Sequence, residues 1–287
     1  MDAGVGAGRR ALLSVGAVAL VFGARAFADE GGSSFWVPGS FANRAALPPP
    51  PGWSVPVQLY YYTGHAPGSA TSESAVTPGT RSQTLQLTLT PTYAPETTVL
   101  GAQPALFVTG GIGYNAVQED QGAASVSQTD TGMTDLTPGG MLTWTRGADN
   151  WLVYLVANLP VGAYSSQRLA NVGLGHGATD AGGGYTYYNP SGGLSWSVVG
   201  GVTYNLEDYS TDYRNGIDLH LGWGVAQSLS TNWRVGLAGY VFYQLTGDSG
   251  SGDHCGACKS RVASLGPQVT YTFTVAGGVR SRSSRLL

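Results

Sequence analysis

Two ionisable residues stand two positions apart in the stretch Ile217 to Leu229, which reads IDLHLGWGVAQSL. In an extended strand, residues i and i+2 point to the same face and lie within about 7 Å of each other. Asp218 and His220 could therefore contact the polar group of a solute together, or form the acid–base pair of a hydrolase. A third interpretation is a solvated wall in which the two side chains pair with each other. Because the sequence identifies no serine or second carboxylate as their partner, we expect no enzyme.

Cys255 and Cys258 form a CxxC motif and are the two cysteines of the chain. A structural zinc site needs four ligands, usually from two such pairs. A redox-active CxxC is expected at the start of a helix in a thioredoxin-like context. Since the motif falls in an expected outer loop of an exported chain, we predict a local disulfide, with no metal site and no cofactor.

The strand that carries Asp218 and His220 has a period of two. Leu219, Leu221 and Trp223 fall on one parity, and the two ionisable residues fall on the other. This pattern predicts a β-strand with one apolar face and one polar or small face. The run is long enough to cross a bilayer, which takes about 9–11 residues at a tilt. Its apolar face could then contact lipid while the polar face lines a wet interior.

Similar strand signals recur along the chain, separated by connections that alternate between short and long. Brief turns on one side and long loops on the other are typical of an up-and-down barrel in the outer membrane. Aromatic residues gather at the ends of the expected strands, as in the girdles at membrane interfaces. The expected strands are residues 54–62, 84–93, 105–114, 136–145, 151–159, 179–188, 194–204, 217–229, 233–245 and 261–273.

The composition agrees with a membrane protein built of strands. Only 11% of the 287 residues are charged, against roughly 25% in ordinary soluble domains. After residue 30 no apolar run approaches the roughly 20 residues that a transmembrane helix needs. The 17 acidic and 14 basic residues form no basic stripe, so we exclude nucleic acid as a partner.

Three segments flank the expected barrel. Residues 1–28 predict a cleaved signal peptide, with Arg9 and Arg10 before an apolar run and a small-residue cleavage site at Ala28. Residues 29–53 lack a period and are rich in proline, which predicts a periplasmic N-terminal segment. A sharper alternative lets their aromatic part tuck into the mouth of the barrel. Residues 274–287 form a basic C-terminal tail without alternation.

Short motifs spread from Phe35 to Phe273 share a common pattern. They include SFWVPG at 34–39, DLTPGG at 135–140, TDYRNG at 211–216, VGLAGY at 235–240, SRV at 260–262 and GPQ at 266–268. With these motifs the chain resembles the outer-membrane proteins grouped with the meta-pathway of phenol degradation. The resemblance implies a β-barrel that passes hydrophobic or aromatic compounds across the outer membrane, and it brings no catalytic residues.

One departure concerns the end of the chain, where the resemblance leads us to expect further strand sequence after Phe273. The ending fits either a natural periplasmic tail or a barrel that lacks its last hairpin. A barrel without that hairpin would be open or strained and would leave strand edges exposed.

We therefore expect an all-β fold, an antiparallel up-and-down transmembrane β-barrel of about 10–12 strands over residues 54–273 in the bacterial outer membrane. Its partners would be outer-membrane lipid and a small hydrophobic or aromatic solute that passes through a narrow lumen. The alternatives are a non-transporting barrel that anchors acidic binding loops, and an outer-membrane hydrolase. The residues expected to face the lumen and contact the solute are Gln86, Thr88, Asp218, His220, Arg234, Tyr240, Gln244 and Gln268.

Overall fold

The computed structural model of the chain describes residues 18–19, 34–37, 39–65, 79–121, 124–252, 259–275 and 279–286. Every regular element in these ranges is a β-strand. None of the described residues forms a helix that is long and apolar enough to cross a membrane. The strands are β1 (Val18–Ala19), β2 (Gly52–Ser54), β3 (Val57–His65), β4 (Arg81–Leu89), β5 (Thr92–Ala94), β6 (Gln103–Gln121), β7 (Ala124–Met133), β8 (Thr137–Arg146), β9 (Asp149–Asn158), β10 (Ala178–Tyr188), β11 (Leu194–Asn205), β12 (Asp218–Ser228), β13 (Trp233–Gln244), β14 (Arg261–Val275) and β15 (Val279–Leu286).

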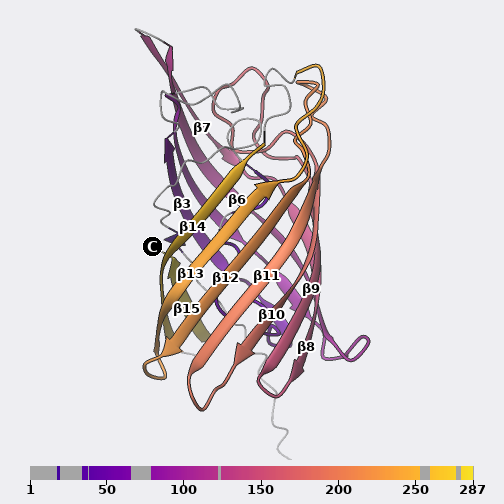
Figure 1. The fold of residues 1–287 in the computed structure, drawn as a ribbon, viewed down its shortest axis with the longest axis vertical. Helices are drawn as coiled ribbons and strands as arrows, with labels where there is room; N and C mark the ends of the chain where they lie inside the picture. The colour runs from indigo at the N-terminus through magenta and orange to yellow at the C-terminus, as the bar shows by residue number, and fades with distance from the viewer. Residues whose placement is uncertain are drawn as a thin grey trace, which may run out of the picture.

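The strands form one sheet that curls into a tilted barrel (Figure 1). The hydrogen-bonded order is β15-β14-β13-β12-β11-β10-β9-β8-β6-β4-β3, and each of these neighbours is antiparallel. In the described residues the path ends at β3 on one side and at β1, which is parallel to β15, on the other. The predicted all-β, antiparallel up-and-down barrel is confirmed, with a sheet that stays open between these two ends.

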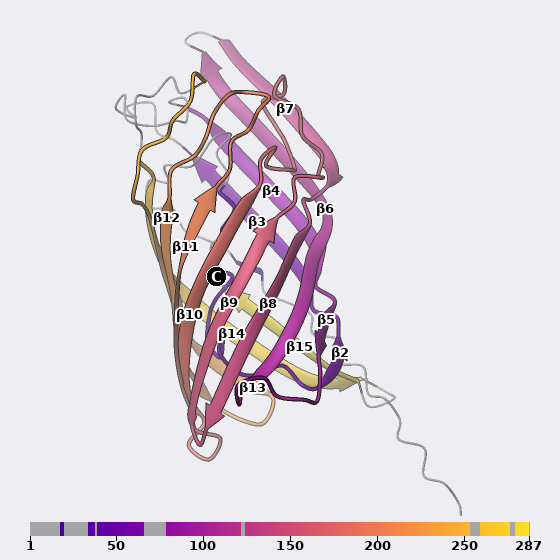
Figure 2. The same cartoon turned by 90° about the vertical axis from the view of Figure 1, so that its right-hand side faces the viewer.

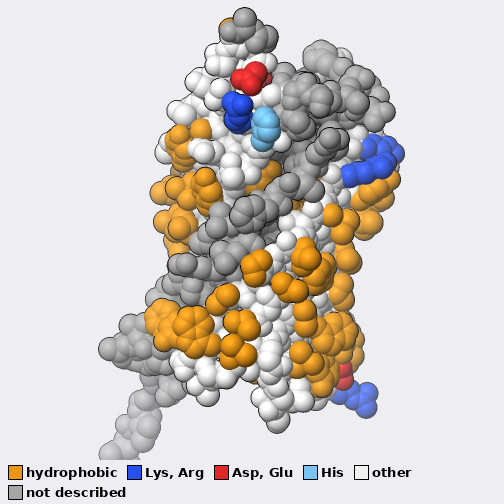
Figure 3. Space-filling model, turned by 60° about the vertical axis from the view of Figure 1, so that its left-hand side comes forward, with side chains coloured by type: hydrophobic (Ala, Val, Ile, Leu, Met, Phe, Trp, Pro, Cys, Tyr) orange, Lys and Arg blue, Asp and Glu red, His pale blue; other side chains and the backbone are white. Residues whose placement is uncertain are grey.

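The two parities of the strands face different surroundings. On β12, Leu219 and Leu221 are 43% and 41% exposed, whereas Asp218 and His220 are 1% and 0% exposed. The same alternation on β4 exposes Leu85, Leu87 and Leu89. Hydrophobic side chains accordingly cover the outer wall, and the charged side chains on the face in Figure 3 lie toward its two ends. An outward apolar belt of this kind suits contact with lipid tails.

Aromatic rings gather on the outside of the barrel close to its short turns. Trp233 packs against Tyr271 at 4.6 Å between ring centroids, and Tyr185 packs against Trp196 at 4.9 Å. The Trp53 and Tyr93 rings form a third pair, at 5.1 Å. Amphipathic rings favour the boundary between hydrocarbon and water, so these pairs fit an interfacial girdle.

Short and long connections lie at opposite ends of the barrel (Figure 1). The tight turns after β8 and β10 place Gly147 and Gly193 at φ values of 64° and 69°. Glycine adopts this left-handed conformation without a steric penalty. The longer connections, residues 159–177, 206–217 and the described part of the third at 245–252, gather at the other end.

Apart from the short strands β1 and β2, two strands lie where the sequence predicts none. β7 falls in an expected loop and forms a hairpin with β6 that projects beyond the barrel (Figure 2). Its sequence ASVSQTDTGM is polar on both parities because neither face meets a core, so it lacks the alternation that marks the other strands. β15 falls in the expected tail and pairs with β14 through the backbone, from Val275↔Val279 to Gln268↔Leu286.

The stretch before the barrel also differs from the preferred prediction. Residues 34–37 and 39–51, which we call the lumen segment, pack at several points against the inner faces of β10 to β13. Trp36 and Ala46 are buried there, 5% and 0% exposed. These residues therefore match the alternative in which the segment tucks into the barrel, and the assignment of residues 29–53 to the periplasm stays a prediction. Their backbone polar groups find partners on the barrel wall, which a stretch without a period cannot reveal in sequence.

Candidate functional site: a cavity in the lumen

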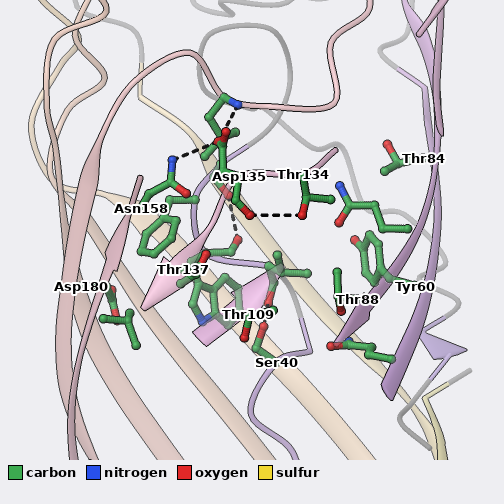
Figure 4. Close-up of a pocket in the computed structure, with 18 of the residues that line it drawn as sticks. Ser40, Tyr60, Thr84, Thr88, Thr109, Thr134, Asp135, Thr137, Asn158 and Asp180 are labelled. Atoms are coloured by element: carbon green, nitrogen blue, oxygen red, sulfur yellow. Dashed lines mark hydrogen bonds between the residues drawn. The ribbon is translucent and has the colours of Figure 1, made fainter. Parts of the chain in front are cut away.

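A cavity of about 460 Å³ lies inside the barrel, bounded on one side by the lumen segment. Figure 4 shows Asp180 of β10 and Tyr60 of β3 on opposite sides, with Asp135 towards one end and Ser40 towards the other. The rings of Trp36 and Phe41 also line it. The cavity thus combines aromatic faces with a small number of polar groups, as binding sites for small molecules do.

Hydrogen bonds hold the lumen segment against the wall. Asn43 Nδ2 donates to the Ser195 carbonyl oxygen at 2.9 Å, and Ser195 Oγ donates back to Asn43 Oδ1 at 2.9 Å. The backbone N–H of Arg44 donates to Ser197 Oγ at 2.7 Å, and that of Ala46 donates to Thr186 Oγ1 at 3.0 Å. Wall hydroxyls thus satisfy backbone groups that have no strand partner of their own.

Two glycines of β12 make room for this segment. A Cβ atom on Gly222 would lie 2.7 Å from the Phe41 carbonyl oxygen, and one on Gly224 would lie 2.6 Å from the Asn43 backbone nitrogen. Both distances are far shorter than a carbon atom tolerates, so the close approach of the two backbones requires glycine. The small residues on the polar parity of β12 are therefore packing positions.

His220 pairs with Asp180 rather than with Asp218. Its Nε2 atom lies 2.7 Å from Asp180 Oδ2, and Thr203 Oγ1 donates to the same oxygen at 2.6 Å. The Trp36 ring stacks on the imidazole, with centroids 4.7 Å apart and planes 15° apart. The Asp218 carboxylate instead accepts from Asn205 Nδ2 at 2.8 Å. The alternative in which Asp218 and His220 pair with each other is replaced by these two separate pairings.

A second polar network lies at the long-loop end of the same wall. Gln244 Nε2 donates to Asp248 Oδ1 at 2.5 Å, and Gln244 Oε1 accepts from the Ser260 backbone at 2.8 Å. Tyr213 Oη donates to Asp248 Oδ2 at 2.5 Å. Gln244 is 0% exposed and has both ends of its amide satisfied, so it fixes the 245–260 connection to the strand.

Asp135 organises the loops that cover the cavity. Its carboxylate accepts from Asn158 Nδ2 at 3.0 Å and from the backbone N–H groups of Gly162 and Leu174 at 2.8 Å each. Three donors on one carboxylate tie the 159–177 connection down over the end of β9. Asp135 and Leu174 both line the cavity, so this loop closes it on the long-loop side.

The eight residues predicted to face the lumen fall into two groups. Gln86, Thr88 and Tyr240 line the cavity, and their contact with a solute stays a prediction. Five others are buried behind the lining and contact protein; these are Asp218, His220, Arg234, Gln244 and Gln268. The cysteines of the predicted disulfide, Cys255 and Cys258, lie outside the described residues.

Most of the cavity lining was missed by sequence reasoning, and four of the missed residues matter most to the site: Trp36, Phe41, Asp135 and Asp180. The first two belong to a stretch without a period, so no pattern indicates their place. Asp180 carries a signal that could have found it, because it is the single charged residue in the β10 sequence ATDAGGGYTYY. A charge in a membrane-spanning strand is expensive unless it faces a wet or paired interior.

Comparisons with known proteins agree with this architecture. A search of curated proteins finds no match. The chain is similar to the crystal structure of an outer membrane channel from Pseudomonas putida F1, with a TM-score of 0.59 and 16% identity over 84% of this chain and 88% of that chain. At this identity the likeness shows the barrel fold alone. The model of the family described as "Putative MetA-pathway of phenol degradation" matches residues 64–282, and the chain belongs to this family.

Proposed function

We propose that this protein is an outer-membrane channel through which small aromatic compounds pass down their gradient. The apolar belt and the barrel fold support a place in the outer membrane. The family, named for phenol degradation, supports an aromatic solute, and the similar structure from Pseudomonas putida F1 is itself an outer membrane channel. Export by a signal peptide at residues 1–28 remains part of the proposal.

The cavity is the observation that carries this proposal. On one side it offers the Trp36 and Phe41 rings, and on the other Tyr60 together with the polar side chains of Gln86 and Thr88. Aromatic faces favour offset or edge contacts with another ring, and each such contact is worth about 0.5–1.5 kcal/mol beyond the burial of area. A monocyclic ring that carries one polar substituent matches both kinds of wall.

Passage through this barrel must be narrow. The lumen segment fills the space beside β10 to β13, and the 159–177 loop covers the cavity from the other end. A solute therefore needs local movement of one of these coverings in order to enter and to leave. We infer a selective passage rather than a wide aqueous pore.

The experiment compares two substitutions on neighbouring residues of β4. Thr88→Trp adds a large ring to the cavity, whereas Leu87→Trp places the same ring in the apolar belt, where Leu87 is 42% exposed. Vesicles with purified protein are assayed for uptake of 4-hydroxybenzyl alcohol, and the rate of protein-free vesicles is subtracted. We expect Thr88→Trp to bring uptake down to the protein-free rate and Leu87→Trp to leave it unchanged.

Electrophoresis with and without boiling controls for folding, because a folded barrel migrates anomalously until it is heated. Equal uptake by the two variants would contradict a route through the cavity. If the folded wild-type barrel takes up no aromatic solute, the alternative function is favoured, in which a non-transporting barrel anchors acidic binding loops.

A further inference from the structure

We propose that the cavity selects aromatic compounds that carry a hydroxyl or ammonium group and excludes aromatic carboxylates, with Asp180 as the residue that contacts the polar group. The inference rests on the proposed channel function and names the class of solute for the same site. It follows from the charges that line the cavity and from the position of one carboxylate beside the aromatic rings of the lining.

All the formal charge on the cavity lining is negative. Among the described residues that line the cavity, the charged side chains are those of Asp135 and Asp180, and no Lys, Arg or His side chain lines it. A bound carboxylate would therefore meet two like charges and no cation. In a partly desolvated site, charges of one sign repel each other far more strongly than in water.

The two carboxylates differ in their partners, which include loop backbone for Asp135 and are side chains for Asp180. Both oxygens of Asp135 already accept hydrogen bonds from the protein, two of them from backbone N–H groups. Asp135 thus adds negative potential to the cavity, while its hydrogen bonds hold the 159–177 loop in place. Its acceptor positions are largely occupied by the protein.

Asp180 presents a carboxylate to the cavity. Thr203 and His220 both contact its Oδ2 atom, and the Tyr154 side chain, which also lines the cavity, hydrogen-bonds to the same carboxylate. The residue is only 2% exposed and yet lines the cavity. A carboxylate oxygen in such a place costs free energy unless it receives a hydrogen bond. A hydroxyl or ammonium group supplies that bond, whereas another carboxylate cannot.

Aromatic side chains stand beside this acceptor. Tyr154 and Phe41 both line the cavity, with ring centroids 5.0 Å apart, and Tyr154 Oη lies 3.4 Å from the His220 nitrogen that faces Asp180. A solute ring that packs on Phe41 and Tyr154 would bring its polar substituent to Asp180. The nearby faces of Trp36 and Tyr240 would also attract an ammonium group through cation–π contact.

His220 does not change the sign of this preference. It lies behind the lining, is 0% exposed, and is covered by the Trp36 ring. Even when the imidazole carries a proton, the atoms that Asp180 presents to the cavity are acceptors. The site therefore favours donors in both protonation states of the pair.

The test uses three compounds with the same ring and one-carbon substituent: benzylamine, benzyl alcohol and benzoate. At neutral pH they are a cation, a neutral alcohol and an anion. We expect vesicles with the wild-type protein to take up benzylamine at least about tenfold faster than benzoate, after subtraction of protein-free vesicles, since a tenfold ratio needs only about 1.4 kcal/mol of discrimination. Benzyl alcohol should enter by the same protein-dependent route.

Asp180→Asn should remove most of the discrimination between benzylamine and benzoate, and Asp180→Glu should retain it. The matched control is Asp120→Asn, which removes one negative charge from a side chain that is 42% exposed and 3.8 Å from Arg81, far from the lining. It should keep the wild-type ratio. If Asp180→Asn does not fold, Gln86→Lys tests the same idea by placing a cation in the cavity, and it should shift the preference towards benzoate.

Equal rates for benzylamine and benzoate in the wild type, or a ratio that neither Asp180→Asn nor Gln86→Lys changes, would overturn the inference and leave the channel standing. Failure of all three compounds to enter through a folded barrel would overturn the channel itself. The two failures are thus distinct results.

Discussion

The two halves of the barrel interior are built differently. The half formed by β10 to β13 is filled, because the lumen segment packs on it and its polar side chains pair with fixed protein groups. The half formed by β3, β4, β6 and β8 faces the cavity, and there Gln86 and Thr88 make no side-chain hydrogen bond with the described residues. Both halves show the same polar parity in sequence.

This difference separates structural polar residues from residues available to a solute. In the filled half, side chains such as Ser195 and His220 are hydrogen-bonded to protein groups, and removing one of them leaves its partner buried and unpaired. In the open half, polar side chains keep free donors and acceptors that a solute can use. Asp180 of β10 belongs to both, since it pairs with His220 and also lines the cavity. Substitutions elsewhere should therefore affect stability on one side and transport on the other.

The largest contrast is expected between His220→Ala and Gln86→Ala. His220→Ala leaves the Asp180 carboxylate buried without its nitrogen partner, and loss of one member of a buried pair costs about 3–5 kcal/mol. Gln86 has no protein partner among the described residues, so Gln86→Ala should stay within about 0.5 kcal/mol. The midpoint of urea unfolding in lipid vesicles measures both. Equal shifts would show that the two halves are not distinct.

A smaller effect is expected when the lumen segment is pushed away from its wall. Gly222→Ala with Gly224→Ala places two methyl groups against the Phe41 and Asn43 backbone, and overpacking of this kind costs about 1–3 kcal/mol. Displacement of the segment should raise single-channel conductance in planar bilayers. Gly200→Ala is the matched control, since its Cβ would lie at an ordinary 3.4 Å from the nearest side-chain atom. An unchanged conductance in the double variant would mean that the segment does not obstruct the lumen.

The barrel wall could be predicted from the sequence because its strands obey one physical rule. Leu219 and Leu221 face outward and Asp218 and His220 face inward, as their alternation predicts. The rule states only that a side chain points inside. The alternation does not show whether that side chain contacts the lumen segment or lines the cavity, because residues in both places have the same parity along the strand. For this reason the residues predicted to face the lumen include both Gln86, which lines the cavity, and His220, which is buried behind the lining.

The packing of the lumen segment inside the barrel could not be predicted from the sequence, and the reason is a different one. Trp36 reaches His220 and Asn43 reaches Ser195 across more than 150 residues of sequence. Contacts between such distant residues leave no local period in the sequence. The hairpin strand β7 and the terminal strand β15 were missed on related grounds, because neither sequence shows the alternation that marks a half-buried strand. Both strands are recognised by their backbone pairing.

A modest effect is expected at the contact between the lumen segment and the short-turn end of β10. The Arg44 guanidinium lies 4.0 Å from the centroid of the Tyr188 ring, and such a contact contributes about 0.5–1 kcal/mol at a partly exposed site. Arg44→Lys keeps the charge and should retain much of this contribution, whereas Arg44→Leu should lose it. Limited proteolysis of the segment reports the difference, and equal cleavage of the two variants would exclude a role for the cation.

The smallest effect concerns pH and the loops rather than the lumen. Burial alone would raise the pKa of Asp208, but hydrogen bonds from Ser210 and Tyr164 outweigh it and hold the pKa below its usual value. A lowered pKa in the folded state stabilises the fold above the unfolded pKa of about 3.9, and this contribution is lost as the pH falls through the lower folded value. The contact between Asp208 and Tyr164 should therefore persist from pH 8 to pH 5 and weaken only in stronger acid.

Hydrogen exchange in the 159–177 and 206–217 connections, measured from pH 8 down to below about pH 4 and corrected for the intrinsic rate at each pH, tests this expectation. Asp208→Asn should make exchange there faster at neutral pH and remove its rise in acid, while exchange in β12 stays unchanged. The loops and the filled half would then open independently, because the carboxylate that links the loops belongs to neither half of the lumen. A rise in loop exchange already at pH 6 would instead assign the control of these loops to a group that titrates at higher pH than Asp208.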